Sequence, residues 1–186
     1  MSLMNKKRNV ILVGPMGAGK SSVGKRLAQV LDLPFVDSDH EIEARLKVSI
    51  STIFDVEGED GFRQRETQVI ADLVEHGARK VLATGGGAVI REENRLALKE
   101  YGTVIYLSSP VKQLVERTRH DTTRPLLQNV DSERVLTALM KVREPFYRQV
   151  ADIVLHTERK SITRVVQEIL NALADRGWPE AKGARA

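Results

Sequence analysis

The feature that most constrains this chain is a glycine-rich run with the pattern G-x-x-x-x-G-K-[ST], which reads Gly14-Pro15-Met16-Gly17-Ala18-Gly19-Lys20-Ser21. It follows an apolar run typical of a buried strand, residues 10–13, and precedes apolar residues at helical spacing up to Leu31. Glycines in such a turn let backbone N–H groups converge on phosphate oxygens, and the N-terminus of the next helix adds partial positive charge. We expect Lys20 to reach the β- and γ-phosphates and the Ser21 hydroxyl to bind Mg²⁺. The pattern therefore predicts a strand–loop–helix unit that binds a nucleoside triphosphate.

Short apolar runs alternate with longer amphipathic runs along the rest of the chain. Further strands are predicted at residues 34–36, 81–83, 103–107 and 153–156. Further helices are predicted over about 40–57, 62–76, 92–100, 110–119 and 132–142, and the last one runs from its cap Ser161 to Gly177. Five strands that alternate with helices predict an α/β fold: three α/β/α layers with a five-stranded parallel sheet. Sheets of this kind bind ligands at the carboxyl ends of their strands.

Composition excludes several classes of protein. The 186 residues suit one domain, for which we expect a frayed tail over residues 177–186. The absence of cysteine excludes disulfide frameworks, thiolate metal sites and iron–sulfur clusters. The longest apolar runs are four residues, whereas a membrane span needs about 20, so we expect a cytoplasmic protein without a membrane partner. The net charge of +4 favours anionic ligands, but one Trp, three Tyr and four Phe are too few for a platform that stacks nucleic-acid bases. We expect a monomer whose partners are small molecules.

Two carboxylates, Asp37 and Asp39, stand at the end of the second predicted strand. They are the best-placed acids, because the third and fourth predicted strands end without an aspartate. One of them could hold the metal through water while the other accepts a proton from a substrate hydroxyl. The alternative is a solvated turn in which the two residues only cap the following helix.

The sequence also resembles a known family, the shikimate kinases, over about residues 8–172. Six elements in a fixed order carry the resemblance: residues 14–21, Asp37-Ser38-Asp39, Gly61-Phe62-Arg63-Gln64-Arg65-Glu66, Thr84-Gly85-Gly86-Gly87, Arg124-Pro125-Leu126-Leu127 and Arg143-Glu144-Pro145-Phe146-Tyr147. Many families share the first element, but the six in this order are far more specific. The resemblance implies a P-loop NTPase fold with substrate-binding helices at about 40–76 and a mobile lid at about 119–130.

Members of that family transfer a phosphoryl group from ATP to the 3-hydroxyl of shikimate, a step toward the aromatic amino acids. The resemblance implies that Asp39 contacts the reacting hydroxyl and that Asp37 supports Mg²⁺ through water. It implies that Arg63 and Arg143 bind the substrate carboxylate and that Gly86 approaches the ring. The catalytic residues it implies are Asp39, Lys20 and Arg124, the last on the lid beside the transferring phosphate. The ATP-binding residues it implies are Gly17, Ala18, Gly19, Lys20, Ser21, Ser22, Arg124 and, near the adenine, Lys160 or its neighbour Arg159.

The residue chemistry agrees with these roles, but each residue also has a plainer interpretation. Two arginines can hold a carboxylate by forked hydrogen bonds. Arg63 and Glu66 are three apart and could simply pair along one helix, and Arg143 could be a solvated helix end. Arg124 could be a surface loop charge. Glycines 85–87 could form a loose loop, although glycines after a buried strand favour close approach of the backbone to a ligand.

Three competing functions stay open at this point. Another small-molecule kinase, acting on gluconate or a nucleoside monophosphate, would share the glycine-rich run, and only an assay separates it. A GTPase-like switch would use the D-x-x-G sequence at residues 55–58, but that run has a helical pattern and the chain has no [NT]-K-x-D motif. A nucleic-acid-binding module is supported by the basic charge alone, and the chain has no basic cluster.

Overall fold

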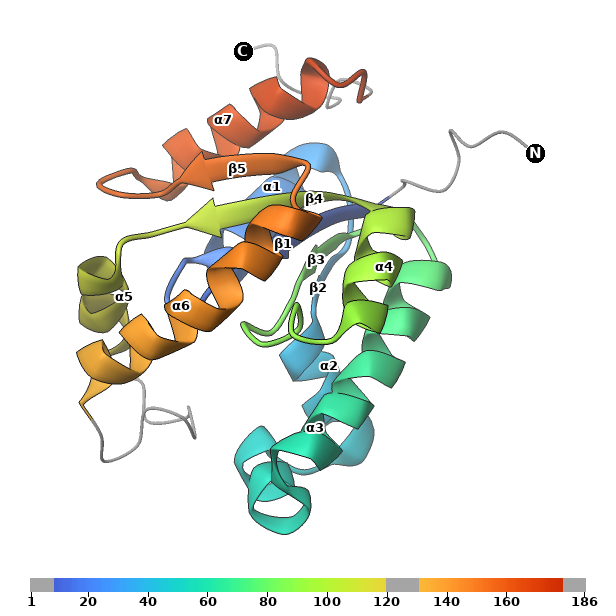
Figure 1. The fold of residues 1–186 in the computed structure, drawn as a ribbon. Helices are drawn as coiled ribbons and strands as arrows, with labels where there is room; N and C mark the ends of the chain where they lie inside the picture. The colour runs from blue at the N-terminus through green and yellow to red at the C-terminus, as the bar shows by residue number, and fades with distance from the viewer. Residues whose placement is uncertain (1–8, 120–130, 179–186) are drawn as a thin grey trace.

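The computed structural model describes residues 9–119 and 131–178. Within them, five parallel strands form one sheet in the order β2-β3-β1-β4-β5, with helices on both of its faces (Figure 1). The strands are β1 (Asn9–Val13), β2 (Phe35–Asp37), β3 (Val81–Ala83), β4 (Gly102–Ser108) and β5 (Ile153–His156). The predicted three-layer α/β/α fold is confirmed.

Two groups of helices cover the sheet. On one face lie α1 (Lys20–Leu31) and α7 (Ile162–Ala174), which pack against each other. The other side carries α3 (Ile50–Glu75), α4 (Glu92–Tyr101), α5 (Val111–Thr118) and α6 (Ser132–Val150), and α2 (Ser38–Leu46) lies against α3. None of the helices in the described ranges is long and apolar enough to cross a membrane.

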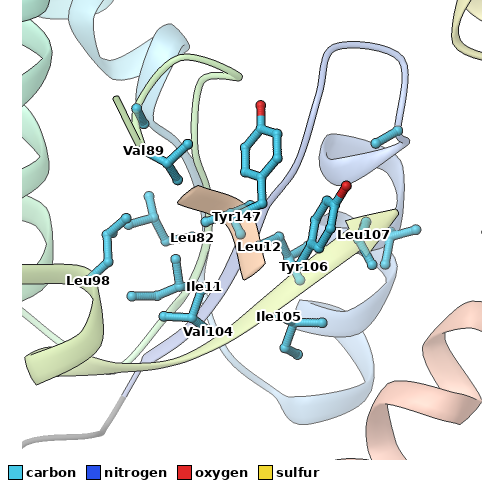
Figure 2. Close-up of a cluster of buried hydrophobic side chains, with 14 of the residues drawn as sticks. Ile11, Leu12, Leu82, Val89, Leu98, Val104, Ile105, Tyr106, Leu107 and Tyr147 are labelled. Atoms are coloured by element: carbon cyan, nitrogen blue, oxygen red, sulfur yellow. The ribbon is translucent and has the colours of Figure 1, made fainter. Parts of the chain in front are cut away.

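The central strands bring the carboxyl ends of β1, β2 and β3 to one edge of the sheet. All five residues of β1 are buried, as expected for a parallel strand covered on both faces, and Figure 2 shows Ile11 and Leu12 among the core side chains. Ala83 of β3 pairs with Leu12 of β1 on one side and with Asp37 of β2 on the other. The carboxyl ends of β1, β2 and β3 therefore lie at the same level, and the segments that follow them meet at one edge of the sheet.

The single helix predicted over residues 40–57 is wrong, because two helices, α2 and the start of α3, occupy this range. Lys47 adopts a left-handed conformation (φ 59°) and ends α2, and the Ser49 side chain then accepts from the backbone N–H of Thr52 at 3.1 Å to cap α3. The break expected between residues 57 and 62 is a kink at Gly58, where φ is +69°. Because glycine alone adopts this conformation without strain, α3 changes direction there and continues.

The predicted end of the helix at about residue 142 is also wrong, because α6 continues to Val150 through Pro145. Proline removes one backbone donor and normally ends or kinks a helix. Here Tyr147 and Val150, which follow Pro145, are both buried, so packing favours the longer helix. This extension places Arg143 on the buried face of α6, away from its ends, and the interpretation of Arg143 as a solvated helix end is wrong.

The C-terminal helix begins and ends with specific contacts. Arg164 N–H donates to the Ser161 side chain at 3.2 Å, so the predicted cap of α7 is confirmed. Trp178, the second residue of the predicted tail, donates from Nε1 to the Thr103 hydroxyl at 3.1 Å, and the Arg79 guanidinium lies 3.9 Å from its ring centroid. Residues 179–186 lie outside the described residues.

Candidate active site

A cavity of about 1100 Å³ opens at the edge of the sheet where the carboxyl ends of β1, β2 and β3 meet. Its walls come from the glycine-rich loop, the start of α2, the loop after β3, the middle of α3 and α6. The predicted site residues that line it are Gly17, Ala18, Gly19, Lys20, Ser21, Ser22, Asp37, Asp39, Arg63, Gly86, Arg143 and Lys160. Arg159, the alternative to Lys160, is 91% exposed and does not line the cavity, and the fold brings together every other predicted site residue except Arg124. That residue, with positions 120–130 of the predicted lid, lies outside the described residues.

The glycine-rich loop has little room for side chains at two of its glycines. A Cβ at Gly14 would lie 2.6 Å from the backbone oxygen of Leu107, and one at Gly17 would lie 2.9 Å from Cγ2 of Thr118. Both glycines also have positive φ values, of 146° and 78°. The loop can therefore wind closely against β4 and α5, as a backbone cradle for phosphate requires.

Lys20 is the buried cation of this cradle. Only 9% of its surface is exposed, and its Nζ donates to the carbonyl oxygens of Gly14 and Pro15 at 2.7 and 2.8 Å. The Lys20 side chain therefore folds back over the glycine-rich loop toward its first two residues. Lys20 also lines the cavity beside this loop, where the predicted contact with phosphate oxygens requires it.

Asp37 connects the cradle to α2. Its Oδ2 accepts from the Ser21 hydroxyl at 2.7 Å, and its Oδ1 accepts from the backbone N–H of Asp39 at 3.1 Å and of His40 at 3.4 Å. The helix-capping interpretation of Asp37 is therefore confirmed. The same carboxylate also stands beside Ser21, so capping and metal binding do not exclude each other.

Asp39 lies in the first turn of α2. Its carboxylate approaches Gly85, as does that of Glu66, which the sequence suggested only as a partner of Arg63. A Cβ at Gly85 would lie 2.5 Å from Oδ1 of Asp39 and 2.8 Å from Oε1 of Glu66. Glu66 is fully buried, and its Oε1 has no hydrogen-bond partner within the described residues. The glycine at position 85 therefore leaves room for both side chains to approach the loop after β3.

Arg63 is held in the cavity wall by two carboxylates. Its guanidinium lies 2.6 Å from Oε2 of Glu66 and 3.1 Å from Oε1 of Glu59. Burial opposes the charge of Arg63, but the two glutamates outweigh it and raise the pKa of the guanidinium above its ordinary value. The predicted pairing of Arg63 with Glu66 is confirmed. The pair is buried in the cavity wall, however, and does not lie on a solvated helix face.

Arg143 is a second buried guanidinium in the same wall, with a different environment. It is 5% exposed, and no carboxylate of the described residues lies within ion-pair distance of it. Burial, together with the positive charge of Arg63, holds its pKa below the ordinary value. Tyr147 and Glu59 oppose this shift, but no ion pair within the described part of the chain neutralises the buried charge, so this part of the cavity favours an anionic ligand.

The other predicted contacts lie at the rim. Lys160 pairs with Glu168 of α7, the two charged groups lying 2.6 Å apart. Arg117 of α5 also lines the cavity and donates to the Gly17 carbonyl oxygen at 3.2 Å, but no local motif in the sequence marks it. The D-x-x-G sequence at residues 55–58 lies within α3 rather than after a strand, as expected from its helical pattern.

Comparisons with known proteins agree with this geometry. The family model of shikimate kinase matches residues 16–174. The shikimate kinase of Pseudomonas syringae pathovar tomato is 54% identical over 168 residues, which cover 90% of this chain and 97% of that protein. The shikimate kinase of Hahella chejuensis is 54% identical over 167 residues, which cover 90% of this chain and 86% of that protein.

Solved structures give the same result. The shikimate kinase from Acinetobacter baumannii in complex with shikimate has a TM-score of 0.89 and 44% identity, and the match covers 95% of this chain and 98% of that chain. A gluconokinase from Sinorhizobium meliloti has a TM-score of 0.65 but only 20% identity over 92% of this chain and 94% of that chain, and so it shares the fold alone. Together with the match over residues 16–174, these relatives show that the chain belongs to the shikimate kinase family.

Proposed function

We propose that this chain carries out the reaction of its family with the residues assembled around the cavity. The γ-phosphoryl group of ATP passes to the 3-hydroxyl of shikimate and gives 3-phosphoshikimate and ADP, a step in aromatic amino acid biosynthesis. The observation that carries the proposal is Arg143, a buried guanidinium without a carboxylate partner in the described ranges, beside the ion-paired Arg63. A substrate carboxylate supplies the missing negative charge, and forked hydrogen bonds from two arginines fix its orientation.

The nucleotide lies along the glycine-rich loop in this proposal. Backbone N–H groups of the loop and Lys20 bind the phosphates, and Lys160 at the rim lies near the adenine. The remaining nucleotide contacts are Gly17, Ala18, Gly19, Ser21 and Ser22, together with Arg124 from the lid at residues 119–130.

A divalent cation fits the neighbouring oxygen atoms. The Ser21 hydroxyl and the Asp37 carboxylate lie 2.7 Å apart at the end of the loop, and hydroxyl, carboxylate and phosphate oxygens are the donors that Mg²⁺ prefers. Ser21 would bind Mg²⁺ directly and Asp37 through water, and the bound ion would neutralise phosphate charge. No cluster of three or more His, Cys, Asp or Glu suited to a metal occurs among the described residues, which agrees with a cation that uses substrate oxygens.

Asp39 acts on the acceptor hydroxyl. It orients the 3-hydroxyl toward the γ-phosphorus and accepts its proton as the new P–O bond forms. Because the transition state of phosphoryl transfer is loose, orientation matters more here than base strength. Lys20 and Arg124 stabilise the negative charge on the transferring group, and a closed lid keeps water away from it.

The proposal also covers the organisation of the whole chain. Residues 1–186 form one kinase domain, in which helices at about 40–76 bind the acceptor substrate and residues 177–186 are the C-terminal tail. The enzyme works as a monomer in the cytoplasm, where ATP is available, and binds neither nucleic acid nor membranes. Size-exclusion chromatography with light scattering tests the monomer.

The decisive experiment is an assay of ADP release with shikimate, gluconate and nucleoside monophosphates tested side by side. We expect shikimate alone to give rapid ADP release, with a requirement for Mg²⁺. Comparable release with gluconate would replace the proposed acceptor by another hydroxy acid. Release with a nucleoside monophosphate would mean that the two arginines bind phosphate instead of carboxylate.

A further inference from the structure

The resemblance assigns no role to Tyr147, a buried polar residue of α6 whose hydroxyl contacts Gly86 in the cavity wall. Tyr147 follows Arg143 by four residues on α6, so both side chains lie on the same face of that helix. The residue is fully buried, and its ring stacks on Tyr106 of β4 with 5.0 Å between centroids and 21° between planes. Figure 2 shows the two rings side by side with their hydroxyl groups pointing the same way. Stacking explains the aromatic ring but leaves the hydroxyl to be explained.

The Tyr147 hydroxyl stands between two groups of the acceptor site. It donates a hydrogen bond to the carbonyl oxygen of Gly86, and the Arg143 guanidinium lies beside it and interacts with it. Burial raises the pKa of the phenol far above its ordinary value, so the hydroxyl keeps its proton and remains a donor. Because its single proton points to Gly86, its oxygen lone pairs remain available to accept from the neighbouring Arg143 guanidinium.

The orientation of the Gly86 carbonyl also fixes the next peptide group. The described chain has no cis peptide, and a trans peptide places the carbonyl oxygen and the following N–H on opposite sides. Holding the Gly86 oxygen toward Tyr147 therefore turns the Gly87 N–H away from α6. The far end of the same loop is held separately, since Arg95 donates to the carbonyl oxygens of Val89 and Ile90 at 2.7 and 2.8 Å. At the end of the loop that lines the cavity, the Gly85 N–H donates to the Ser38 hydroxyl at 3.0 Å, and the Gly86 carbonyl oxygen accepts from Tyr147.

We propose that Tyr147 is a positioning residue for the acceptor substrate, which holds the Arg143 guanidinium and the Gly86 backbone at a fixed separation. This inference rests on the proposed function, because it takes Arg143 as a ligand of the substrate carboxylate and Gly86 as a neighbour of the ring. In this role the Tyr147 hydroxyl does not touch the reacting atoms. It sets the distance between Arg143 and Gly86 to match the distance between the carboxylate and the ring of the substrate.

The test is Tyr147→Phe, which keeps the ring stack and removes only the hydroxyl. The matched control is Tyr106→Phe, which removes a hydroxyl from the same stacked pair but not from the contact between Arg143 and Gly86. Calorimetric titration with shikimate alone measures binding, and steady-state kinetics measure the KM of each substrate. For Tyr147→Phe we expect about tenfold weaker shikimate binding and a similar rise in its KM, with the KM for ATP unchanged. For Tyr106→Phe we expect wild-type values.

A shikimate analogue whose carboxylate is reduced to an alcohol provides a second measurement. If Tyr147 acts through Arg143, the loss caused by Tyr147→Phe shrinks with the analogue, because the analogue no longer uses Arg143 fully. Unchanged shikimate binding by Tyr147→Phe would overturn the inference, as would equal losses for both tyrosine variants or equal rises in the KM of ATP and shikimate. If the wild-type protein itself does not bind shikimate, the proposed function fails instead, so the two failures are distinct.

Discussion

Gly87 lies directly against the guanidinium of Arg63, so that a Cβ at position 87 would overlap Nη2, Cζ and Nη1 of the arginine. The guanidinium has little freedom to move aside, because Glu66 and Glu59 hold it by ion pairs of 2.6 and 3.1 Å. The glycine after β3 is thus required by a side chain of the candidate substrate site.

Gly87→Ala is expected to displace the Arg63 guanidinium without unfolding the chain. Gly87 has no positive φ, so alanine suits its backbone and the strain falls on the arginine. Because a misplacement of about 1 Å can reduce rates a hundredfold, we expect kcat/KM for shikimate to fall by about ten- to a hundredfold. The KM for ATP serves as the internal control and should not change. Wild-type kinetics with shikimate would show that Arg63 moves aside freely or does not contact the substrate.

Asp37→Asn separates metal binding from helix capping. Asparagine still caps α2, so stability should change little, but a neutral amide is a weaker partner for a hydrated cation. We expect the Mg²⁺ concentration for half-maximal activity to rise by about tenfold or more at saturating substrates. Asp32→Asn, which removes an exposed carboxylate at the other end of α1, is the matched control and should keep the wild-type Mg²⁺ requirement. An unchanged requirement in Asp37→Asn would assign the metal to other residues.

Lys20→Ala is expected to abolish transfer while the protein stays folded. The variant loses the ammonium that we propose binds the phosphates, so turnover should fall by a factor of about a hundred or more. Lys112→Ala removes an exposed lysine of α5 and is the control for general loss of charge. Circular dichroism checks the fold of both variants. Turnover near the wild-type value in folded Lys20→Ala would mean that the glycine-rich loop does not bind the transferring phosphate.

Asp39→Asn should lower turnover far more than it weakens ATP binding. The amide has the size of the carboxylate but can neither accept the proton of the hydroxyl nor orient it by a charge-assisted hydrogen bond, and the loss of such a group costs about a hundred- to ten-thousandfold in rate. Turnover at saturating substrate and ATP affinity are measured on the same preparation. The opposite pattern, with normal turnover at saturation and weak binding of ATP with Mg²⁺, would move the metal role from Asp37 to Asp39.

Sequence reasoning located the cradle and the sheet edge well, because both follow from local patterns. Loop, strand and helix at residues 10–31 are adjacent in the chain, and an all-buried strand such as β1 has a continuous apolar signature. It was less successful where packing between distant segments decides. The extension of α6 through Pro145 depends on the burial of Tyr147 beside β4 and the loop after β3, which lie far away in sequence.

The same reason explains which site contacts could not be predicted. The spacing of Arg63 and Glu66 showed that they could pair, but not that α3 places the pair against Gly87 in a cavity wall. Arg117 reaches the cavity only because α5 packs beside the glycine-rich loop, and the sequence around it has no signal for this contact.

The last prediction concerns Arg63 and the substrate carboxylate. If the two meet, Arg63→Ala removes a charge-assisted contact of about 1.5–3 kcal/mol, which lowers kcat/KM for shikimate by roughly ten- to a hundredfold and leaves ATP binding largely unchanged. The substitution also leaves the buried Glu66 without its main partner, and breaking such a pair costs about 3–5 kcal/mol of stability. Adding Glu66→Gln to Arg63→Ala removes that charge, so the double variant should recover stability in thermal unfolding but not the lost kcat/KM.

The shikimate analogue with an alcohol in place of the carboxylate then tests the contact itself. Residues and groups that touch each other show non-additive losses, so Arg63→Ala should weaken the reaction of the analogue much less than that of shikimate. Four kcat/KM values, for the wild type and Arg63→Ala with each acceptor, give the coupling between guanidinium and carboxylate. Additive losses would show that the two groups do not meet. Arg63 would then only pair with Glu66 and Glu59, and the carboxylate would have to be bound by Arg143 without it.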